Sequence, residues 1–224
     1  MKVYVVIAAY NEEKSIEKVI LDLKKYGYKN IVVVDDGSKD RTSDIAKKNK
    51  VHIIMHVINR GQGAGLKTGI DYALSKKADV IVTFDADGQH QAKDIERLVK
   101  PLKEGYDAAL GSRFIGKGMS NVPLLRRFIL KAGALLLKIM YGAKLTDSHN
   151  GFRALSSKAA KKIKITSNGM EHASEIIEEI VKRKLRYIEV PVTIKYTDYS
   201  KLKGQSSLNA FKILFKMMIK KIIG

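Results

Sequence analysis

Two aspartates two residues apart, Asp85 and Asp87, directly follow an apolar, β-branched segment at residues 79–84. This segment has the composition of a buried parallel strand, and if the chain is still extended beyond it, the two carboxylates lie on one side. Two carboxylates at this spacing can hold Mg²⁺ or Mn²⁺ and leave room for a diphosphate and water. A second interpretation is that these acids cap a turn, or a helix near Gln91. The surrounding elements have to decide between the two.

The first half of the chain repeats a strand followed by a helix at regular spacing. Strands are predicted at residues 2–9, 30–34, 51–57, 79–84 and 107–111, and helices at residues 15–26, 42–49, 66–74 and 94–103. This order predicts an α/β fold with a Rossmann-like, doubly wound, mostly parallel sheet, right-handed crossovers and helices on both faces. Acidic residues follow three of these strands, at the edge where such sheets bind ligands. We therefore expect one crevice to be lined by Glu12, Asp35, Asp36, Asp85 and Asp87.

Beyond residue 116 the pattern changes. A long apolar helix is predicted at residues 123–141, with Arg126, Arg127, Lys131 and Lys138 as its only charges. A loop that enters a short strand at 145–154, a helix at 171–184 and a strand at 187–194 follow. Pro191 predicts that this last strand lies at an edge or bends. The closing helix, at 208–223, has one lysine stripe and a wide apolar arc, so it either packs on the domain or lies on a bilayer.

The glycine-rich segment at residues 59–65 is expected to be a loop that opens a helix at Leu66. It is not a phosphate-binding P-loop, because no Gly-Lys-Ser/Thr follows it.

Composition and charge exclude some classes of protein and favour others. At 224 residues the chain is long enough for one domain with a full core. It has no cysteine, which excludes disulfides, thiol nucleophiles and zinc–thiolate sites. We see no N-terminal signal and no run of about 20 apolar residues that would predict a membrane span.

The charge is concentrated in the second half. Residues 1–112 carry 19 Lys and Arg against 16 Asp and Glu, a net charge of +3, whereas residues 113–224 carry 23 against 7, a net charge of +16. A basic half-chain is expected to bind a polyanion, which is nucleic acid, anionic lipid or a phosphorylated substrate.

Seven short motifs resemble, in their order, the family 2 glycosyltransferases of the GT-A fold, nearest to the polyprenyl-phosphate (dolichyl-phosphate) mannosyltransferase group. The motifs lie at residues 9–12, 35–42, 59–65, 85–89, 111–113, 147–153 and 189–191. The resemblance covers roughly residues 1–205 and implies a glycosyltransferase domain there. Its nucleotide-sugar-binding half would be residues 1–112 and its acceptor-binding half residues 113–205, followed by an amphipathic basic helix at 206–224.

The resemblance also implies roles for individual residues. The donor would be bound by Ala8, Tyr10, Glu12, Val34, Asp35, Asp36, Asp85, Ala86, Gln89 and Lys201. Within this set Tyr10 and Glu12 would contact the nucleoside, Asp35 or Asp36 its base, and Lys201 would close over the phosphates. The divalent metal, Mg²⁺ or Mn²⁺, would be held by Asp85, Asp87 and Gln89. The catalytic set would be Asp87, Arg113 and Arg127, the two arginines binding the acceptor's phosphate. Ala8 replaces the usual proline of these relatives, and Lys131 a frequent small hydroxyl residue.

The function implied is the inverting, metal-dependent transfer of a hexose, mannose or glucose, from GDP-mannose or UDP-glucose to a polyprenyl phosphate. An acceptor phosphate is already ionised at neutral pH, so little general-base help is needed, and the basic second half would place it. We expect a cytoplasmic enzyme in peripheral contact with the inner face of the cell membrane, with no nucleic-acid partner.

Three other functions stay open. A sugar-hydroxyl acceptor on a glycan or glycolipid would need a general base, for which Asp147 is the main candidate. A sugar-phosphate nucleotidyltransferase would also be α/β and use metal, but its early glycine-rich activation loop with a basic residue is missing. A basic membrane- or nucleic-acid-binding module would explain the charge and leave the clustered acids unexplained. His90 either supports the site residues or is an ordinary loop residue, and we favour the latter. His149 lies in a plausible acceptor loop, but we interpret it as structural.

Overall fold

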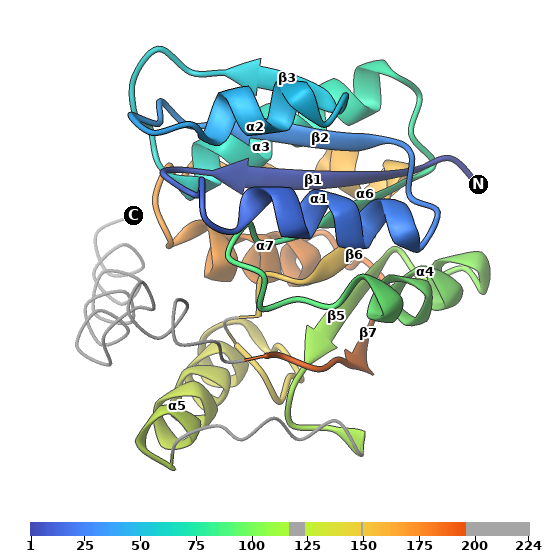
Figure 1. The fold of residues 1–224 in the computed structure, drawn as a ribbon. Helices are drawn as coiled ribbons and strands as arrows, with labels where there is room; N and C mark the ends of the chain where they lie inside the picture. Colours follow the sequence, from blue (N-terminus) through green and yellow to red (C-terminus); the bar gives the residue numbers. More distant parts are fainter. Residues whose placement is uncertain (117–123, 149, 196–224) are drawn as a thin grey trace.

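The computed structural model describes residues 1–116, 124–148 and 150–195, and in them seven strands form one sheet (Figure 1). The strand order is β3-β2-β1-β4-β6-β5-β7. Neighbouring strands run parallel except at β6, so the predicted mostly parallel sheet is confirmed. The strands are β1 (Val3–Ala9), β2 (Ile31–Asp35), β3 (His52–Met55), β4 (Val80–Thr83), β5 (Ala108–Ser112), β6 (Arg153–Ser156) and β7 (Tyr187–Pro191). β7 lies at the edge of the sheet, as Pro191 predicted.

The direction of β6 was not predicted, and it positions the site. β6 lies between β4 and β5 and runs antiparallel to both, with Thr83 of β4 opposite Arg153. Because the two strands run in opposite directions, the start of β6 lies beside the end of β4. The hydroxyl of Thr83 donates to the carbonyl of Gly151 at 2.5 Å. The loop before β6 is thereby held at the carboxyl edge, where Asp85 follows β4.

Helices cover both faces of the sheet, as predicted (Figure 1). α1 (Ile16–Lys25), α2 (Thr42–Lys48), the short 3₁₀ helix η1 (Ala92–Asp94) and α4 (Ile95–Lys103) contribute to the hydrophobic core on one face. α3 (Gln62–Ser75), α6 (Ser157–Lys162) and α7 (His172–Lys182) contribute to the core on the other. α5 (Leu124–Tyr141) lies at the β5–β7 end of the molecule.

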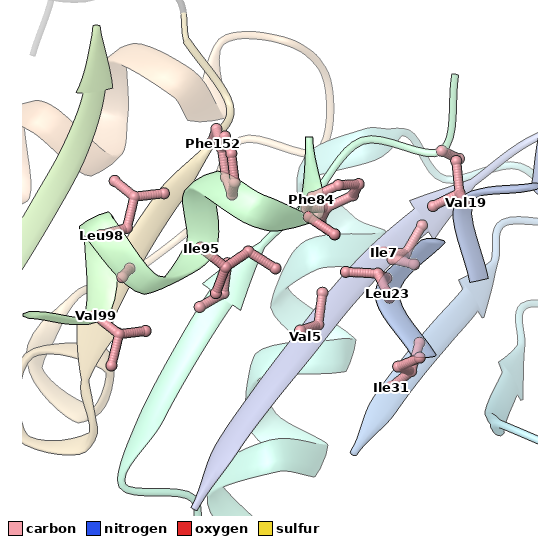
Figure 2. Packing of buried hydrophobic residues seen from close by; sticks show 14 of the residues in the cluster. Val5, Ile7, Val19, Leu23, Ile31, Phe84, Ile95, Leu98, Val99 and Phe152 are labelled. Atoms are coloured by element: carbon pink, nitrogen blue, oxygen red, sulfur yellow. The ribbon is translucent and has the colours of Figure 1, made fainter. Parts of the chain in front are cut away.

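The core follows from the spacing of apolar residues. In α1 the buried side chains recur at the three- and four-residue intervals of one helical face: Ile16, Val19, Ile20 and Leu23. Figure 2 shows Val19 and Leu23 packed near Val5 and Ile7 of β1. Burying each such side chain contributes about 1.5–3 kcal/mol. Closer to the carboxyl edge, the rings of Phe84 and Phe152 meet edge to face, with centroids 5.2 Å apart. This pair joins the end of β4 to the start of β6 directly beneath the acids.

α3 begins at Gln62, four residues earlier than predicted, so the glycine-rich segment is partly helix. Close packing explains why glycines begin a helix here. A Cβ on Gly63 would lie 2.1 Å from the carbonyl oxygen of Ser167, and one on Gly65 would lie 2.9 Å from the Cβ of Ala8. The first-turn N–H groups of residues 63 and 64 donate to one carbonyl, that of residue 168, at 2.8 and 3.2 Å. These two N–H groups are therefore already bound to the backbone of residue 168, in agreement with the absence of a P-loop motif.

α6 was also not predicted. Its first turn is capped by Ser156, whose hydroxyl accepts a hydrogen bond from the backbone N–H of Ala159 at 3.1 Å. The serine pair at residues 156–157 was the available signal, since serine is a preferred N-cap residue.

α5 packs through Leu137 against Ile177 of α7 and leaves an apolar face exposed. Phe128, Leu135 and Ile139 are 70%, 57% and 73% exposed. Within the three described ranges, no helix is long and apolar enough to cross a bilayer. The closing helix predicted at 208–223 lies outside the described residues.

Candidate active site

Asp85 lies at the carboxyl edge of the sheet, directly beyond β4. Its Oδ1 accepts a hydrogen bond from Nε2 of Gln62 at 3.2 Å, and its Oδ2 lies 3.2 Å from Nε2 of His90. Burial raises the pKa of Asp85 to about 6, and the positive charges of Arg153 and Arg113 oppose this rise. The carboxylate is thus held from two elements, α3 and the loop after β4, and two cations are close enough to affect its ionisation.

His90 anchors the turn that carries the two acids. Its buried ring stacks on Phe152, with centroids 4.6 Å apart, and meets Phe84 edge-on. Nδ1 accepts the backbone N–H of Asp85 at 3.1 Å. Burial lowers the pKa of His90 to about 4, so the ring is neutral at pH 7 and its proton resides on Nε2, the nitrogen near the Asp85 carboxylate. The interpretation of His90 as an ordinary loop residue was wrong, because its position depends on packing between two aromatic rings distant in sequence.

Asp87 closes a turn with Gln89. The backbone N–H of Gln89 donates to Oδ1 at 3.0 Å, and its side-chain amide donates to Oδ2 at 2.8 Å. Burial, and then the negative charge of Asp85, raise the pKa of Asp87 to about 6. Asp87 therefore stabilises a turn, as the second interpretation predicts, and a cation would relieve its repulsion with Asp85, as the metal interpretation requires.

Asp85 and Asp87 are suited to a divalent metal ion that binds together with a diphosphate. In the part of the chain that the structure describes, no group of three His, Cys, Asp or Glu is placed to hold a metal ion. Glu12 adds negative charge close to both Asp85 and Asp87. Mg²⁺ commonly takes one or two protein carboxylates and fills its other positions with phosphate oxygens and water. The donor set fits Mg²⁺ or Mn²⁺ bound together with a diphosphate.

The two acids at the end of β2 have different surroundings. Oδ1 of Asp36 lies 2.6 Å from Nδ1 of His56, and its carboxylate accepts the backbone N–H groups of residues 60 and 61 at 3.0 and 2.6 Å. Asp36 therefore anchors the segment that leads into α3. Asp35 accepts one backbone N–H, that of Ser38, at Oδ1 and 3.0 Å. Of the two, Asp35 is the candidate that this geometry favours for contact with a nucleoside base.

The other residues predicted to bind the donor substrate differ in side-chain exposure and polarity. Tyr10, just beyond β1, is 41% exposed, and Glu12 is buried. Val34 is fully buried in the core under α3, Ala86 lies in the opposite core, and Ala8 packs against the first turn of α3. The last three side chains carry no polar group, so any donor contact at these positions is with backbone atoms or an apolar surface.

Arg113, which follows β5, forms a buried ion pair with Asp147. Nε donates to Oδ2 at 2.6 Å and Nη2 to Oδ1 at 3.2 Å, and the backbone N–H of Arg113 also donates to Oδ2, at 3.1 Å. Both side chains are almost completely buried. Both oxygens of Asp147 thus accept from one guanidinium, which weakens its interpretation as a general base and fixes the orientation of the predicted acceptor-phosphate residue.

Arg153, at the start of β6, is a second buried cation, for which sequence reasoning assigned no role. Its Nε donates to the carbonyl of Asn150 at 3.0 Å and its Nη2 to the carbonyl of Ala173 at 2.8 Å. Burial lowers its pKa to about 10, and the charges of Asp147 and Asp85 oppose this, so Arg153 stays charged at pH 7. The residue was visible in the motif at 147–153, but only the direction of β6 brings it near Asp85.

Of the remaining site residues predicted from the sequence, Arg127 alone lies in the part of the chain that the structure describes. Arg127 is exposed on α5. Lys201 and His149 lie outside the described residues, and their roles stay predictions. Gln62 was missed because it was assigned to a loop, and its contact with Asp85 follows from the early start of α3.

Comparison with known proteins places this geometry in a family. The sequence pattern described as "Glycosyl transferase family 2" matches residues 4–164. The UDP-N-acetylglucosamine–dolichyl-phosphate N-acetylglucosaminyltransferase of Methanococcus voltae is 35% identical, over 98% of this chain and 96% of that protein. The dolichol-phosphate mannosyltransferase of Pyrococcus furiosus is 31% identical, over 97% of this chain and 64% of that longer protein.

The fold is also that of a solved glycosyltransferase. Glucosyl-3-phosphoglycerate synthase from Mycobacterium tuberculosis, crystallised with Mn²⁺, UDP and phosphoglyceric acid, superposes with a TM-score of 0.72 at 18% identity, covering 96% of this chain and 78% of that chain. The family pattern spans most of the chain, and paired acids occupy the edge where such a sheet binds ligands. This chain therefore belongs to glycosyl transferase family 2 and is a glycosyltransferase with the GT-A fold.

Proposed function

We propose that this enzyme transfers a hexose from a nucleotide sugar to the phosphate of a polyprenyl lipid, with Mg²⁺ or Mn²⁺ as cofactor. The observation that carries the proposal is the charge arrangement around Asp85, where the acids at the end of β4 lie near two buried guanidinium groups, those of Arg113 and Arg153. Acids suit a metal-bound donor diphosphate, and nearby cations suit an anionic acceptor.

The proposed reaction is a single displacement at C1 of the sugar. An oxygen of the acceptor phosphate forms a bond to C1 from the face opposite the leaving group. The bond from C1 to the β-phosphate oxygen breaks, and its electron pair leaves with the nucleoside diphosphate. The product is the sugar linked to the lipid phosphate with inverted configuration. No proton needs to be removed, because the attacking oxygen is already ionised at neutral pH.

The residues of this chain would supply positioning and charge. Asp85 and Asp87 would hold the metal, which neutralises the charge developing on the leaving diphosphate. Gln62 and His90 orient the first carboxylate, and Gln89 orients the second. Pre-oriented groups cost little reorganisation when the transition state forms.

The acceptor is assigned from the pairing of Asp147. A sugar-hydroxyl acceptor needs a carboxylate able to remove a proton, whereas both Asp147 oxygens bind Arg113. Arg113, close enough to lower the pKa of Asp85, would hold the acceptor phosphate beside the donor. The two relatives are named for different sugars, so GDP-mannose, UDP-glucose and UDP-N-acetylglucosamine are the donors to compare.

The exposed face of α5 supports peripheral contact with the bilayer that carries the lipid, which we place at the cytoplasmic face. Phe128, Leu135 and Ile139 recur at intervals of seven and four residues and are exposed, with Arg127 and Lys131 exposed on the same helix. Apolar side chains flanked by cations are typical of helices that lie in a membrane interface.

The test is a transfer assay with the three donors, a short-chain polyprenyl phosphate and Mn²⁺ or Mg²⁺. We expect transfer with one donor, abolished by EDTA and reduced by about 10²-fold or more in Asp87→Asn. Asp71→Asn, which changes an exposed aspartate of α3, is the matched control and should leave transfer unchanged. Metal-dependent donor binding with transfer only to a sugar hydroxyl would overturn the acceptor assignment. Binding to DNA with no donor binding would overturn the enzyme proposal.

A further inference from the structure

The edge strand β7 carries a carboxylate that holds the loop before β6. Both carboxylate oxygens of Glu189 accept from the backbone N–H of Thr146, each at 2.9 Å, and one of them also accepts from the Thr146 hydroxyl at 3.1 Å. It also accepts the backbone N–H of Asp147 at 3.1 Å. Two residues earlier on β7, the hydroxyl of Tyr187 accepts the backbone N–H of Lys144 at 2.9 Å. One side of this strand therefore fixes residues 144–147 in place.

The loop fixed in this way orients Arg113. Asp147, whose backbone N–H binds Glu189, directs both carboxylate oxygens to the Arg113 guanidinium. The hydroxyl of Thr146 lies 2.7 Å from that of Ser112, the residue before Arg113. Both loop residues that contact Glu189 thus also contact the end of β5: Asp147 binds Arg113, and Thr146 lies against Ser112.

The carboxylate is not needed to attach β7 to the sheet. The backbone of β7 pairs with β5 over five residues, from Ala108 opposite Tyr187 to Ser112 opposite Pro191. Beyond the strand, the N–H of Val192 donates to the carbonyl of Ser112 at 3.0 Å. The Glu189 carboxylate instead binds the loop, through Thr146 and Asp147.

We propose that Glu189 is a positioning residue for acceptor binding: it fixes the backbone at Thr146 and Asp147 so that Asp147 presents the Arg113 guanidinium to the acceptor's phosphate. This inference rests on the proposed function, in which Arg113 binds that phosphate. A guanidinium held in one orientation binds a phosphate with less loss of side-chain freedom than a free one. Loss of the Glu189 carboxylate should therefore weaken acceptor binding and leave donor binding intact.

The experiment compares the full-length wild type with Glu189→Gln in the transfer assay. The glutamine is nearly isosteric, but it places an NH₂ group against backbone N–H donors. We expect the KM for a short-chain polyprenyl phosphate to rise about tenfold. The affinity for the nucleoside diphosphate with Mn²⁺, measured by titration calorimetry, should stay within about twofold of the wild-type value. The reason is that the substitution displaces Arg113 and not Asp85 or Asp87.

Glu179→Gln is the matched control. Glu179 is buried, whereas Glu189 is half-buried, and it also accepts a backbone N–H, that of Lys164 at 2.9 Å, but it lies on α7 and binds Arg183. It should lower the melting temperature without changing the acceptor KM. An equal rise in acceptor KM in this control would overturn the proposal, because a general loss of stability would then be enough to weaken acceptor binding.

A double-mutant cycle with Arg113→Lys separates positioning from general stability. If Glu189 acts through Arg113, Glu189→Gln should change the acceptor kcat/KM by less than about twofold in the Arg113→Lys background. Additive losses would overturn the proposal, as would an unchanged acceptor KM in Glu189→Gln. Wild type that binds donor but does not transfer to polyprenyl phosphate would overturn the proposed function and this inference with it. Wild-type transfer with an unchanged Glu189→Gln would overturn this inference alone.

Discussion

The backbone of Gly151 lies against the carboxylate of Asp85: a Cβ at residue 151 would be 3.2 Å from Oδ1 and 3.4 Å from Oδ2. This glycine stands in the loop before β6, so the strand whose direction was not predicted also limits the space around the Asp85 carboxylate. The contact explains why residue 151 is glycine without any requirement for a positive φ.

We predict that Gly151→Ala weakens metal-dependent donor binding by about tenfold, because the added methyl group displaces the Asp85 carboxylate. The measurement is the Mn²⁺ dependence of nucleoside diphosphate binding. Gly169→Ala is the control, because the close neighbour of a Cβ there is the end of the flexible Glu171 side chain. Equal effects of the two variants would show that Asp85 is not what the methyl group disturbs.

Gln62→Ala should also weaken metal-dependent donor binding, by a smaller factor of about three to ten. The variant removes the amide that donates to Asp85 Oδ1, and the net contribution of a typical hydrogen bond, about 0.5–1.5 kcal/mol, corresponds to a factor of this size. Calorimetric titration of the Mn²⁺–nucleotide complex checks it. Asn49→Ala removes an amide that donates to the carbonyl of Ile45, away from the acids, and should have no effect on this titration.

His172 should reduce stability in mild acid. Burial lowers its pKa from 6.5 to about 4, so between these values the unfolded chain takes up a proton that the folded chain does not. The contribution is fully present above pH 6.5 and is lost as the pH falls towards 4, by up to about 3 kcal/mol. Asp85 and Asp87, whose pKa values are raised to about 6, act in the opposite direction in the same range.

Because these effects offset each other, the test is a difference between two proteins. His172→Asn keeps a side-chain N–H near the carbonyl of Gly169, which His172 Nδ1 approaches at 2.8 Å. Urea unfolding at pH 7.5 and 5 should show a smaller loss of stability for the variant than for the wild type. The exposed His52, changed to Asn, provides the control, and an identical pH dependence in wild type and His172→Asn would refute the prediction.

Replacing the apolar face of α5 should reduce membrane binding. Phe128→Ser with Ile139→Ser removes two exposed apolar side chains, each contributing about 1.5–3 kcal/mol if fully buried in lipid. We expect binding to vesicles of phosphatidylcholine and phosphatidylglycerol, measured by co-sedimentation, to fall by about tenfold or more. Leu21→Ser with Met55→Ser changes two similarly exposed apolar residues elsewhere. If both pairs bind vesicles equally, α5 is not the docking surface.

The fold was largely predictable because its signals are local. The spacing of Ile16, Val19, Ile20 and Leu23 predicts a helix, and the β-branched run before Asp85 predicts a buried strand. The direction of β6 has no such signal, because a four-residue strand that follows a helix and a loop can pair in either direction. It is decided by packing between segments far apart in the sequence, such as the pair of Phe84 and Phe152.

The position of the two acids of the candidate site was predictable, whereas the residues that contact them were less so. Asp85 and Asp87 were found because they follow a strand directly. Gln62 contacts Asp85 across a sequence separation that no motif spans, and the pairing of Arg113 with Asp147 requires the loop before β6 to reach the end of β5. Residues that bind a ligand carry their chemistry in their type, whereas residues that orient them are recognised only by position.

The antiparallel strand has a consequence for how the chain folds. β4 and β5 are not paired with each other, and β5 is paired with β6 and β7, which both follow residue 150. A fragment ending at Ser112 would thus contain β5 without either of its neighbours. The sheet is completed only when two strands from the second half of the chain, β6 and β7, pair with β5. This favours late, non-local contacts over independent folding of the two halves. The arrangement of Asp85 and Asp87 beside Arg113 and Arg153 is therefore expected to form, and to be lost, in one cooperative transition.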